Sequence, residues 1–485
     1  LKVRFELATR NESREGWCVV GETLLTVAGA DPPTVLLVTS DTHRADHVRV
    51  SGAGVEVRTP ALDALAARGV FFEDCFSSTN VTNPSHAALM TGITPRDTGV
   101  INNYTPLGDA APTLAEAFAQ AGWRTFAAVS TPHLGDRGSG LGQGFDRMST
   151  PRLRKRPAAS TVAALESWLP EAEGVPLFVW LHLFDAHTPY PPPPEFDRIY
   201  YPPDKDPFDP ALPEPQIPKW YQREMPGLRD LEFARAQYRA EVTYLDSQLR
   251  RVFGHPRLGG GVIAVTADHG ESLGQHGIYW DHAELYPDSV HVPMLLAWPG
   301  GPAGVRVSQP VSHLDLPRTL LELTGLPSAA AFPGQSLLPR IREAAEGTAR
   351  DQGAPPRFAL SSKGFSASVT KDGWHLILHL RKHLVTEGAE RVPVRVHSVE
   401  LYHLEVDPNC ERDLVDDEKQ RAREMRRLLI AWLDASEPRG WGEEGRLDAE
   451  TLAQMAMLGY TQEAAPRGDR AWFEPDGCEE CSAFD

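Results

Sequence analysis

A threonine lies at the start of a short helix-forming segment whose sequence suits ester chemistry. The segment 82–92, TNPSHAALMTG, predicts a helix with Asn83 as its N-cap, Pro84 as its first residue and Gly92 after its end. The free backbone N–H groups and the positive end of the helix dipole would then face Thr82 and hold an anionic oxygen beside its hydroxyl. A threonine before an N-cap is by itself most often part of an ordinary helix start, so residues elsewhere in the chain decide.

Two carboxylates and an imidazole follow short apolar runs that have the form of buried parallel strands. One run ends just before Asp41, and another ends just before Asp268 and His269. In open α/β sheets ligands bind at the carboxyl ends of the strands, so these side chains are expected at one edge. We predict that they hold a divalent metal together with the Thr82 oxygen.

Helical patterns alternate with the apolar runs, and this alternation predicts an α/β fold with a mostly parallel central sheet flanked by helices on both faces. Prolines are so dense from Tyr190 to Pro218 that neither a helix nor a central strand is expected there. This excursion either roofs the pocket or is a decorative loop. The predicted strands are Val35–Val38, Leu177–His182 and Val262–Val265, and the predicted helices are Pro60–Arg68, Thr113–Ala121 and Phe233–Phe253.

The chain divides into four predicted segments. An N-terminal extension, 1–33, contains a predicted strand from Trp17 to Thr26, and the catalytic α/β domain spans 34–345. Period-two patterns predict a small antiparallel sheet in a C-terminal α+β subdomain, 346–435, followed by a helix from Glu418 to Leu433. The acidic C-terminal tail, 436–485, is expected to pack peripherally or to lack order.

Composition excludes some partners. The 485 residues carry a formal net charge of −18, which argues against nucleic acid and anionic membranes as the main partner. No stretch approaches the ~20 apolar residues of a membrane span. We therefore expect a small-molecule ester as the substrate, and homo-oligomerisation is left open. Because the sequence begins with Leu1 rather than Met, we expect an exported enzyme, periplasmic or secreted, whose leader has been removed.

Five cysteines are too few and too scattered for a disulfide framework. Cys478 and Cys481 form a C-x-x-C pair in the acidic tail, with no second pair to complete a zinc site. We interpret them as a weak redox or disulfide pair, or as residues without a function.

Several motifs resemble the sulfatase branch of the alkaline phosphatase superfamily. In that family the pattern Cys-x-Pro-Ser-Arg-x-x-x-x-Thr-Gly carries a cysteine that becomes formylglycine. Here the Pro, Ser, Thr and Gly match, whereas Thr82 replaces the cysteine and His86 the arginine, so formylglycine cannot form. The resemblance implies an alkaline-phosphatase-like fold. Further matching motifs are TPALDAL at 59–65, TADHGE at 266–271 and ELYHL at 400–404.

The resemblance also implies metal ligands. The family positions that match Asp41, Asp268 and His269 bind a metal. Here Asp41 is followed by Thr42 rather than by the second aspartate of the usual calcium site. The loss of a hard carboxylate favours Zn²⁺ or Mn²⁺ over Ca²⁺, as in phosphonate monoester hydrolase relatives.

A second set of side chains matches substrate-binding positions. The resemblance implies that His133 and His187 contact the ester, and we add His86 and Asn83 beside the nucleophile. His282 occupies the place of a lysine near the leaving group in many sulfatases, and we predict that it is the general acid. Each of His133, His187 and His282 taken alone could instead be a structural histidine.

Other ionisable residues of these motifs have less certain roles. His182 ends the second predicted strand, Asp185 follows it closely, and His276 precedes the predicted general acid. Asp185, His187 or His276 could hold a second ion, so the number of metals is left open.

Three replacements of permanent cations indicate the charge of the substrate. His86, Thr131 and His282 stand where the family has arginine or lysine, so the pocket favours a monoanionic or neutral ester over a dianionic one. Sulfate monoesters and phosphodiesters share that charge, and the nucleophile separates them. A sulfated threonine must be hydrolysed at sulfur, whereas a phosphorylated threonine beside a metal is open to in-line attack by water.

We therefore predict a metal-dependent hydrolase of phosphodiesters, phosphonate monoesters or phosphotriesters that forms a covalent intermediate on Thr82. Three alternatives remain at this point. They are a sulfatase with an unmodified threonine, a transferase of phosphoethanolamine or phosphoglycerol, and a non-catalytic binding protein that kept the fold.

Overall fold

The computed structural model describes residues 32–327, 332–349, 353–387, 390–443, 447, 449–457 and 472–473. The predicted strand Trp17–Thr26 and the pair Cys478 and Cys481 lie outside these residues. Among the described residues, no helix is both long and apolar enough to cross a membrane.

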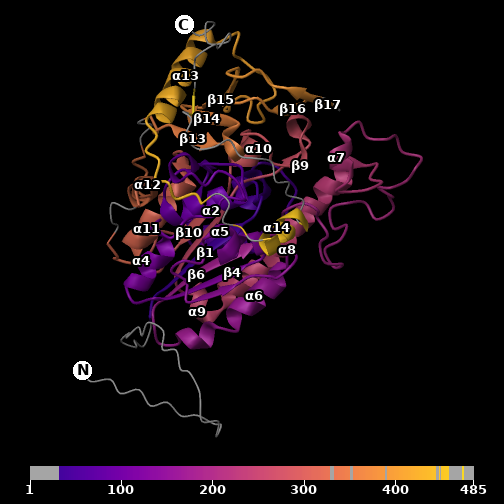
Figure 1. Ribbon diagram of the computed structural model, residues 1–485. Helices are drawn as coiled ribbons and strands as arrows, with labels where there is room; N and C mark the ends of the chain where they lie inside the picture. The colour runs from indigo at the N-terminus through magenta and orange to yellow at the C-terminus, as the bar shows by residue number, and fades with distance from the viewer. Residues whose placement is uncertain are drawn as a thin grey trace, which may run out of the picture.

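An eight-stranded sheet forms the centre of the molecule (Figure 1). Its strand order is β11-β2-β10-β7-β1-β6-β4-β5, and β10 is the strand that runs antiparallel to both neighbours. The predicted, mostly parallel sheet is therefore confirmed. The eight strands are β1 (Thr34–Ser40), β2 (Val70–Phe72), β4 (Arg124–Val129), β5 (Arg147–Ser149), β6 (Leu177–Leu183), β7 (Val262–Ala267), β10 (Met294–Ala297) and β11 (Val305–Val307).

The three strands predicted from the sequence lie side by side. β1 pairs in parallel with β6 on one side and with β7 on the other. Every residue of Val35–Val38 is fully buried, which explains why β1 is a continuous apolar run rather than an alternating one. The carboxyl ends of the three strands consequently share one edge of the sheet.

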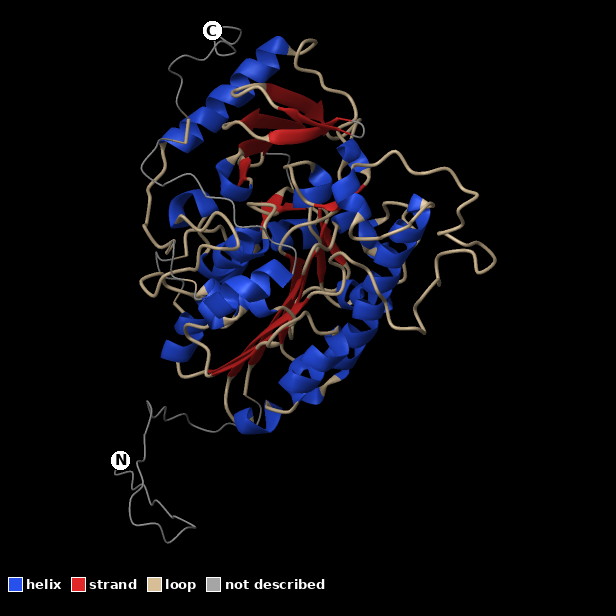
Figure 2. Ribbon diagram, turned by 45° about the vertical axis from the view of Figure 1, so that its right-hand side comes forward, coloured by secondary structure: helices blue, strands red, loops and turns tan. Residues whose placement is uncertain are grey.

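Helices cover both faces of this sheet, and Figure 2 shows the sheet between the two helical layers. Leu36 and Val38 of β1 pack toward one layer, and Val35 and Leu37 toward the other, because successive side chains of a strand point to opposite faces. The first layer contains α1 (Pro60–Ala67), α6 (Ala158–Glu166), α8 (Leu231–Gly254) and α9 (Pro256–Gly259). The second layer contains α2 (Thr82–Thr91), α4 (Leu114–Gln120), α11 (Leu316–Leu323) and α12 (Leu338–Ala345).

A small antiparallel sheet follows near the C-terminus, at the top of Figure 1. It consists of β13 (Arg357–Leu360), β14 (Ser366–Lys371), β15 (Trp374–His379) and β18 (Val399–His403), in that order. Helix α13 (Lys419–Asp434) packs on it through Ala422, Met425 and Leu429. The predicted antiparallel sheet is confirmed, whereas the boundaries at 34, 346 and 436 stay predictions.

Short elements complete the described chain. The proline-rich segment 190–218 contains neither helix nor strand, as predicted. Part of the tail packs on the catalytic domain, because the Gly108 N–H donates to the Trp441 carbonyl. The remaining strands are β3 (Cys75–Phe76), β8 (Ser272–Leu273), β9 (Tyr279–Asp281), β12 (Val311–Ser312), β16 (Leu384–Glu387) and β17 (Glu390–Pro393). The remaining α-helices are α3 (Pro95–Thr98), α5 (Asp136–Ser139), α7 (Lys219–Gln222), α10 (Pro287–Val290) and α14 (Ala449–Met457).

Helix α1 is capped by a residue of another helix. Asp246 of α8 is fully buried and accepts the backbone N–H groups of Ala61 and Leu62, each at 2.9 Å. The local N-cap residue, Thr59, makes no side-chain capping bond to α1. Asp246 therefore satisfies two helix-end donors that would otherwise be buried without acceptors.

We expect Asp246→Ala to lower the free energy of unfolding by about 2–4 kcal/mol, because both N–H groups lose their acceptor. Asp246→Asn should lower the free energy of unfolding by less than Asp246→Ala does, since its amide oxygen can still accept one bond. Denaturant-induced unfolding measures both changes. Glu166→Ala removes a partly exposed ion pair with Arg251 and serves as the control, with a loss of at most about 1 kcal/mol. A loss for Asp246→Ala no larger than this control would contradict the assigned role.

Candidate active site

Helix α2 begins one residue earlier than the sequence indicated. It spans Thr82–Thr91 with Val81 as its N-cap, so the prediction of Asn83 as the N-cap is wrong. The reason is that the Asn83 side chain is used elsewhere, since its Nδ2 donates to the Thr105 carbonyl at 2.9 Å. Thr82 is therefore the first residue of the helix rather than a residue before it.

The start of α2 offers fewer free donors than expected. The Asn83 N–H donates to Asn103 Oδ1 at 2.8 Å, Pro84 has no N–H, and the Ser85 N–H already bonds to the Val81 carbonyl at 3.0 Å. An anion beside Thr82 would therefore interact with the helix mainly through its dipole. The prediction that several backbone N–H groups bind the anion is not supported by this arrangement.

The predicted metal ligands converge on one point. Thr82 Oγ1 lies 3.3 Å from His269 Nε2, which in turn lies 3.4 Å from Asp268 Oδ2 and 3.9 Å from Asp41 Oδ1. All four residues are fully buried. Asp41 is delivered by the end of β1, Asp268 and His269 by the end of β7, and Thr82 by the start of α2. The threonine hydroxyl is thus within coordination distance of a cation held by the other three side chains.

Hydrogen bonds from outside the cluster fix the direction of each ligand. His269 Nδ1 must donate to the Gly270 carbonyl, at 2.9 Å, so its Nε2 carries a lone pair toward the cluster. Asp268 Oδ1 accepts the N–H groups of Thr42 and His269, at 3.2 and 2.9 Å. Thr42 reaches this position with a left-handed φ of 53°, which is unusual for a β-branched residue.

His182 plays the same positioning role for Asp41. Its Nδ1 accepts the Ser130 N–H, so its Nε2 donates to Asp41 Oδ2 at 3.1 Å. Burial lowers the pKa of His182 to about 3, which keeps the ring neutral in this tautomer. His182 therefore orients one oxygen of Asp41 and leaves the other directed at His269.

Two carboxylate oxygens of the cluster are left for a cation or a proton to satisfy. Within the described residues, neither Asp41 Oδ1 nor Asp268 Oδ2 has a hydrogen-bond partner. Burial raises the pKa of both carboxyl groups well above the ordinary value, and for Asp268 the neighbouring charge of Asp41 adds to the effect. Two oxygens, an imidazole lone pair and a hydroxyl in a water-poor site form a donor set that fits a divalent metal.

Two further imidazoles lie near this cluster. The His282 ring lies 4.2 Å from the His269 ring and 6.1 Å from the His187 ring, measured between centroids. His282 is partly exposed and His187 retains 7% exposure, whereas Thr82 has none. His187 Nδ1 donates to the Thr188 carbonyl at 2.7 Å. The leaving-group role of His282 and the ester-binding role of His187 stay predictions.

The other predicted substrate-binding residues are held deeper. His86 Nδ1 donates to the Thr82 carbonyl at 2.8 Å, and its Nε2 lies 3.0 Å from the Thr39 hydroxyl. His133 is fully buried, with Nδ1 at 2.8 Å from Thr131 Oγ1. Both rings lie near the cluster, but the hydrogen bond from His86 Nδ1 ties the His86 ring to the backbone of Thr82. The assignment of Asn83, His86 and His133 to substrate binding stays a prediction.

A lysine missed by sequence reasoning lies near the site. Lys155 Nζ donates to the carbonyls of His187 and Pro189, both at 2.9 Å, and its ammonium lies 5.4 Å from the centre of the Phe184 ring. Its charge interacts with Asp41 and Asp185, so it partly balances the buried acids. The signal was the basic run Arg152–Arg156, which is unusual in so acidic a chain.

Asp185 and His276 have structural partners. Asp185 Oδ1 accepts the Ala158 N–H at 3.0 Å and so caps helix α6, while burial raises the pKa of Asp185 to about 6. His276 stacks on Tyr286 and lies 2.8 Å from the Asn409 carbonyl. Neither residue, nor His187, belongs to a three-ligand group among the described residues. A second ion on these side chains stays a prediction.

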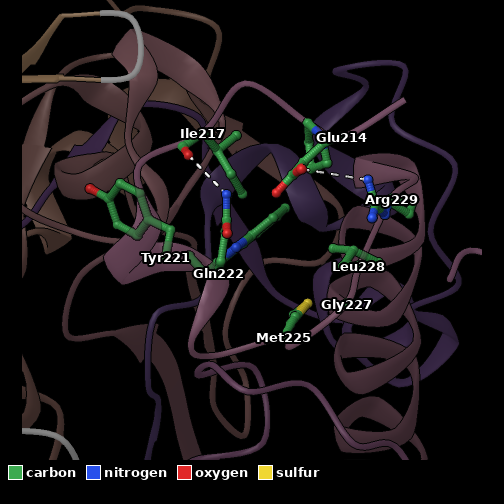
Figure 3. A pocket seen from close by; sticks show the side chains of 10 residues that line it. Glu214, Ile217, Tyr221, Gln222, Met225, Gly227, Leu228 and Arg229 are labelled. Carbon is green, nitrogen blue, oxygen red and sulfur yellow. Dashed lines mark hydrogen bonds and ion pairs between the residues drawn. The ribbon is translucent and has the colours of Figure 1, made fainter. Parts of the chain in front are cut away.

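A cavity of about 90 Å³ lies under the proline-rich excursion. Figure 3 shows Glu214 and Arg229 side by side in its lining, where they form an ion pair at 3.8 Å. Trp280 of β9 lines the cavity as well, whereas Thr82 and the metal ligands do not. The excursion therefore packs beside the strand that leads to His282, and its cavity is separate from Thr82 and the predicted metal ligands.

Comparisons with known proteins agree with this geometry. The sulfatase family model matches residues 33–326. A sulfatase from Formosa agariphila is 26% identical over 386 residues, which cover 66% of this chain and 74% of that protein. Arylsulfatase K of Bos taurus is 25% identical over 435 residues, which cover 79% of this chain and 78% of that protein. The crystal structure of the phosphonate monoester hydrolase of Agrobacterium radiobacter superposes with a TM-score of 0.63 at 21% identity, covering 82% of this chain and 95% of that one.

The matched segment contains the central sheet, the four converging side chains and the imidazoles of His187 and His282. It ends just after α11, so the C-terminal sheet lies outside it. The structural match shows the alkaline-phosphatase-like fold that sulfatases and phosphonate monoester hydrolases share. More than half of the chain is covered by a single family, and the chain belongs to the sulfatase family.

Proposed function

We propose that this member of the sulfatase family hydrolyses phosphoric or phosphonic esters through a covalent intermediate on Thr82. The observation that supports this proposal best is the position of Thr82 Oγ1, which lies 3.3 Å from His269 Nε2, the nitrogen that also approaches Asp268 Oδ2 and Asp41 Oδ1. A hydroxyl in that place is a competent nucleophile once its proton is lost.

Asp41, Asp268 and His269 would hold the metal, for which Zn²⁺ or Mn²⁺ suits the donor set better than Ca²⁺. When bound, the metal lowers the pKa of the Thr82 hydroxyl and offsets charge on the transferring group. Thr82 Oγ1, its proton released to solvent before the first turnover, forms a bond to phosphorus while the bond to the leaving oxygen breaks. His282 donates a proton to that oxygen, so the alcohol leaves neutral.

The second half-reaction restores the threonine. Water attacks phosphorus opposite Thr82 Oγ1, and His282, now neutral, accepts the proton of that water. The bond between phosphorus and Thr82 breaks, and the acid product leaves. Both steps are in-line displacements at phosphorus, which positioned electrostatic groups accelerate without further covalent chemistry.

Phosphorus esters are preferred over sulfate esters because of the nucleophile. A formylglycine enzyme eliminates sulfate from carbon, but Thr82 offers no such route, so a sulfated enzyme would have to be cleaved at sulfur. Lys155 adds one permanent cation near the site, yet both of its resolved bonds go to backbone carbonyls and its charge is shared among several buried acids. The pocket therefore still favours esters with at most one negative charge.

Membership in the sulfatase family supports a second candidate, a sulfatase that uses the unmodified threonine. The chemistry of the central atom separates the two candidates, since both use the same nucleophile and the same metal ligands. Aryl phosphodiesters, phosphonate monoesters, phosphotriesters and aryl sulfates with the same leaving group allow a direct comparison of kcat/KM. Faster turnover of the sulfate than of every phosphorus ester would favour the sulfatase.

Thr82→Ala should lower kcat for the best substrate by at least about 10³-fold, because no other hydroxyl replaces the nucleophile. Thr82→Ser keeps the oxygen and should keep measurable turnover. Mass spectrometry of the parent, quenched during turnover and then digested, should show the mass of one phosphoryl or phosphonyl group on the peptide that contains Thr82. Thr91→Ala, a change at the far end of the same helix, is the control for disturbance of α2. An alanine variant at position 82 as active as this control would exclude the covalent mechanism.

Removal of the metal should abolish turnover and lower the melting temperature, because Asp41 and Asp268 then face each other without a counter-charge. A metal at 100–1,000 times its dissociation constant stabilises a folded protein by about 2.7–4 kcal/mol. Dialysis against a chelator, followed by addition of Zn²⁺, Mn²⁺ or Ca²⁺ and a thermal melt, measures the effect. Asp268→Asn should show little recovery of activity with any of the three ions. Full activity of the chelated parent, confirmed metal-free by elemental analysis, would refute a catalytic metal.

His282→Gln should reduce kcat strongly for alkyl esters and weakly for nitrophenyl esters, since nitrophenolate leaves without a proton. A series of esters with leaving groups of increasing pKa measures this as a steeper dependence of log kcat on that pKa in the variant. His276→Gln, which changes a histidine bonded to Asn409, should leave the slope unchanged. Equal slopes for the His282→Gln variant and the parent would remove His282 as the general acid.

A further inference from the structure

A second group of metal-ligating side chains lies where the C-terminal sheet meets the catalytic domain. Glu284 follows β9, two residues after His282, while His379 ends β15 and His383 follows it. One ligand atom from each of the three lies within 4.8 Å of the others. The side chains of Glu284 and His383 are each 7% exposed and that of His379 is 2% exposed. Electron-rich atoms from two parts of the chain thus meet in a nearly buried place.

The hydrogen bonds of His383 leave a lone pair directed at Glu284. His383 Nδ1 lies 2.8 Å from the Arg381 carbonyl, and because a carbonyl accepts only, this nitrogen carries a proton. His383 Nε2 lies 3.0 Å from Glu284 Oε1. In the neutral ring that nitrogen has a lone pair facing a carboxylate oxygen. The contact is favourable with a second proton on the ring or with a cation between the two atoms.

The bonds of His379 give a second lone pair in the same place. Its Nε2 lies 2.8 Å from Glu400 Oε1. Glu400 also accepts the hydroxyls of Tyr286 and Tyr402, at 2.8 and 2.6 Å, and a carboxylate ringed by donors is in its charged, accepting form. His379 Nε2 is therefore the protonated nitrogen, and its Nδ1 carries the lone pair.

Ser366 provides too few protons to satisfy these acceptors. Its hydroxyl lies 3.2 Å from both Glu284 Oε2 and His379 Nδ1, which the pairing of Ser366 with His379 in the sheet brings together. A hydroxyl donates one bond, so one of these two atoms stays without a donor from Ser366. Glu284 Oε1 and His383 Nε2 likewise have no proton between them when the His383 ring is neutral.

We propose that Glu284, His379 and His383 form a second metal site, suited to Zn²⁺. Two imidazoles and one carboxylate are a common zinc donor set, with Ser366 Oγ or a water as the fourth ligand. Each imidazole already donates its other ring nitrogen to an oxygen acceptor, which is the outer-shell pattern of zinc-binding histidines. The Arg391 guanidinium opposes a positive charge here, whereas Glu284, whose Oε1 lies 3.0 Å from His383 Nε2, favours it.

The same pattern holds at the catalytic site, where His269 donates Nδ1–H to the Gly270 carbonyl and directs Nε2 at two carboxylates. The second site differs because its ligands come from the catalytic domain and from the C-terminal sheet. Glu284 lies two residues after His282, and Asn80 Nδ2 donates to the carbonyls of His282 and Glu284, at 2.6 and 3.3 Å. A metal bound by Glu284 would therefore also fix the loop that carries His282. Its role is to position that loop and to join the two parts, without contact to the substrate.

The number of zinc ions bound by the full-length chain tests this proposal. After loading with Zn²⁺ and gel filtration, elemental analysis should give two ions per parent chain. The background variant Asp41→Asn with Asp268→Asn, which disables the catalytic site, should keep one. Adding Glu284→Gln, His379→Gln or His383→Gln to this background should leave none. His403→Gln, a histidine at the end of β18 outside the cluster, is the matched control and should keep one ion.

Spectra and melting curves provide a readout that does not depend on activity. Co²⁺ added to the background variant should give the visible absorption of a four-coordinate nitrogen and oxygen site, and Zn²⁺ should raise its melting temperature. Glu400→Gln in this background should weaken Zn²⁺ binding by about 10–100-fold, because it removes the partner that orients His379.

A background variant that folds, by circular dichroism, but retains no zinc would show that a proton on His383 satisfies Glu284 and would overturn the proposal. Retention of one ion after each of the three glutamine substitutions would overturn it as well. Because the background lacks catalytic ligands, either result leaves the Thr82 mechanism untouched, and failure of that mechanism leaves this test valid.

Discussion

The central constraint on this structure is the burial of two carboxylate oxygens that both lie within 3.9 Å of His269 Nε2 and have no hydrogen donor among the described residues. Asp41 Oδ1 and Asp268 Oδ2 have no partner among the described residues, and both side chains are fully buried. Such an arrangement is costly unless a cation or a proton is bound between the groups. The neighbours of the two aspartates do not relieve this cost. His182, Thr42 and the His269 N–H occupy the other oxygens and so hold the orphan atoms in place.

The sheet supplies this geometry because β7, β1 and β6 are adjacent and parallel. Their carboxyl ends place Asp268, Asp41 and His182 in a row, and the packing of α2 on the same edge adds Thr82. Thr82, the proposed nucleophile, is the first residue of a helix whose side chains are buried throughout. A rigid element therefore sets the position of the hydroxyl, as a site that depends on distances near 3 Å requires.

Sequence patterns predicted the elements that depend on residues close to one another in the chain. The apolar runs that end at Asp41 and Asp268 identified both strands and the polar side chains that converge after them, because polar residues after a buried strand lie at its carboxyl edge. The start of α2 was misplaced because the contact of Asn83 with Thr105 crosses 22 residues and leaves no local pattern. Lys155 was missed for a similar reason, since a basic run in a loop does not reveal which of its members turns inward.

The second cluster shows this limit most clearly. Period-two segments predicted the strand that His379 ends, yet no spacing links it to Glu284, 95 residues earlier in the chain. The two meet because the small sheet docks on the catalytic domain beside the loop after β9, so the cluster is a property of the docking rather than of either sequence segment. The docking surface is therefore polar as well as apolar, since it includes the nearly buried pair of Glu284 and His383, which is unfavourable without a positive charge. A proton or a metal ion at this junction links the position of the C-terminal sheet to the loop that carries His282, whose ring lies 4.2 Å from the ring of His269.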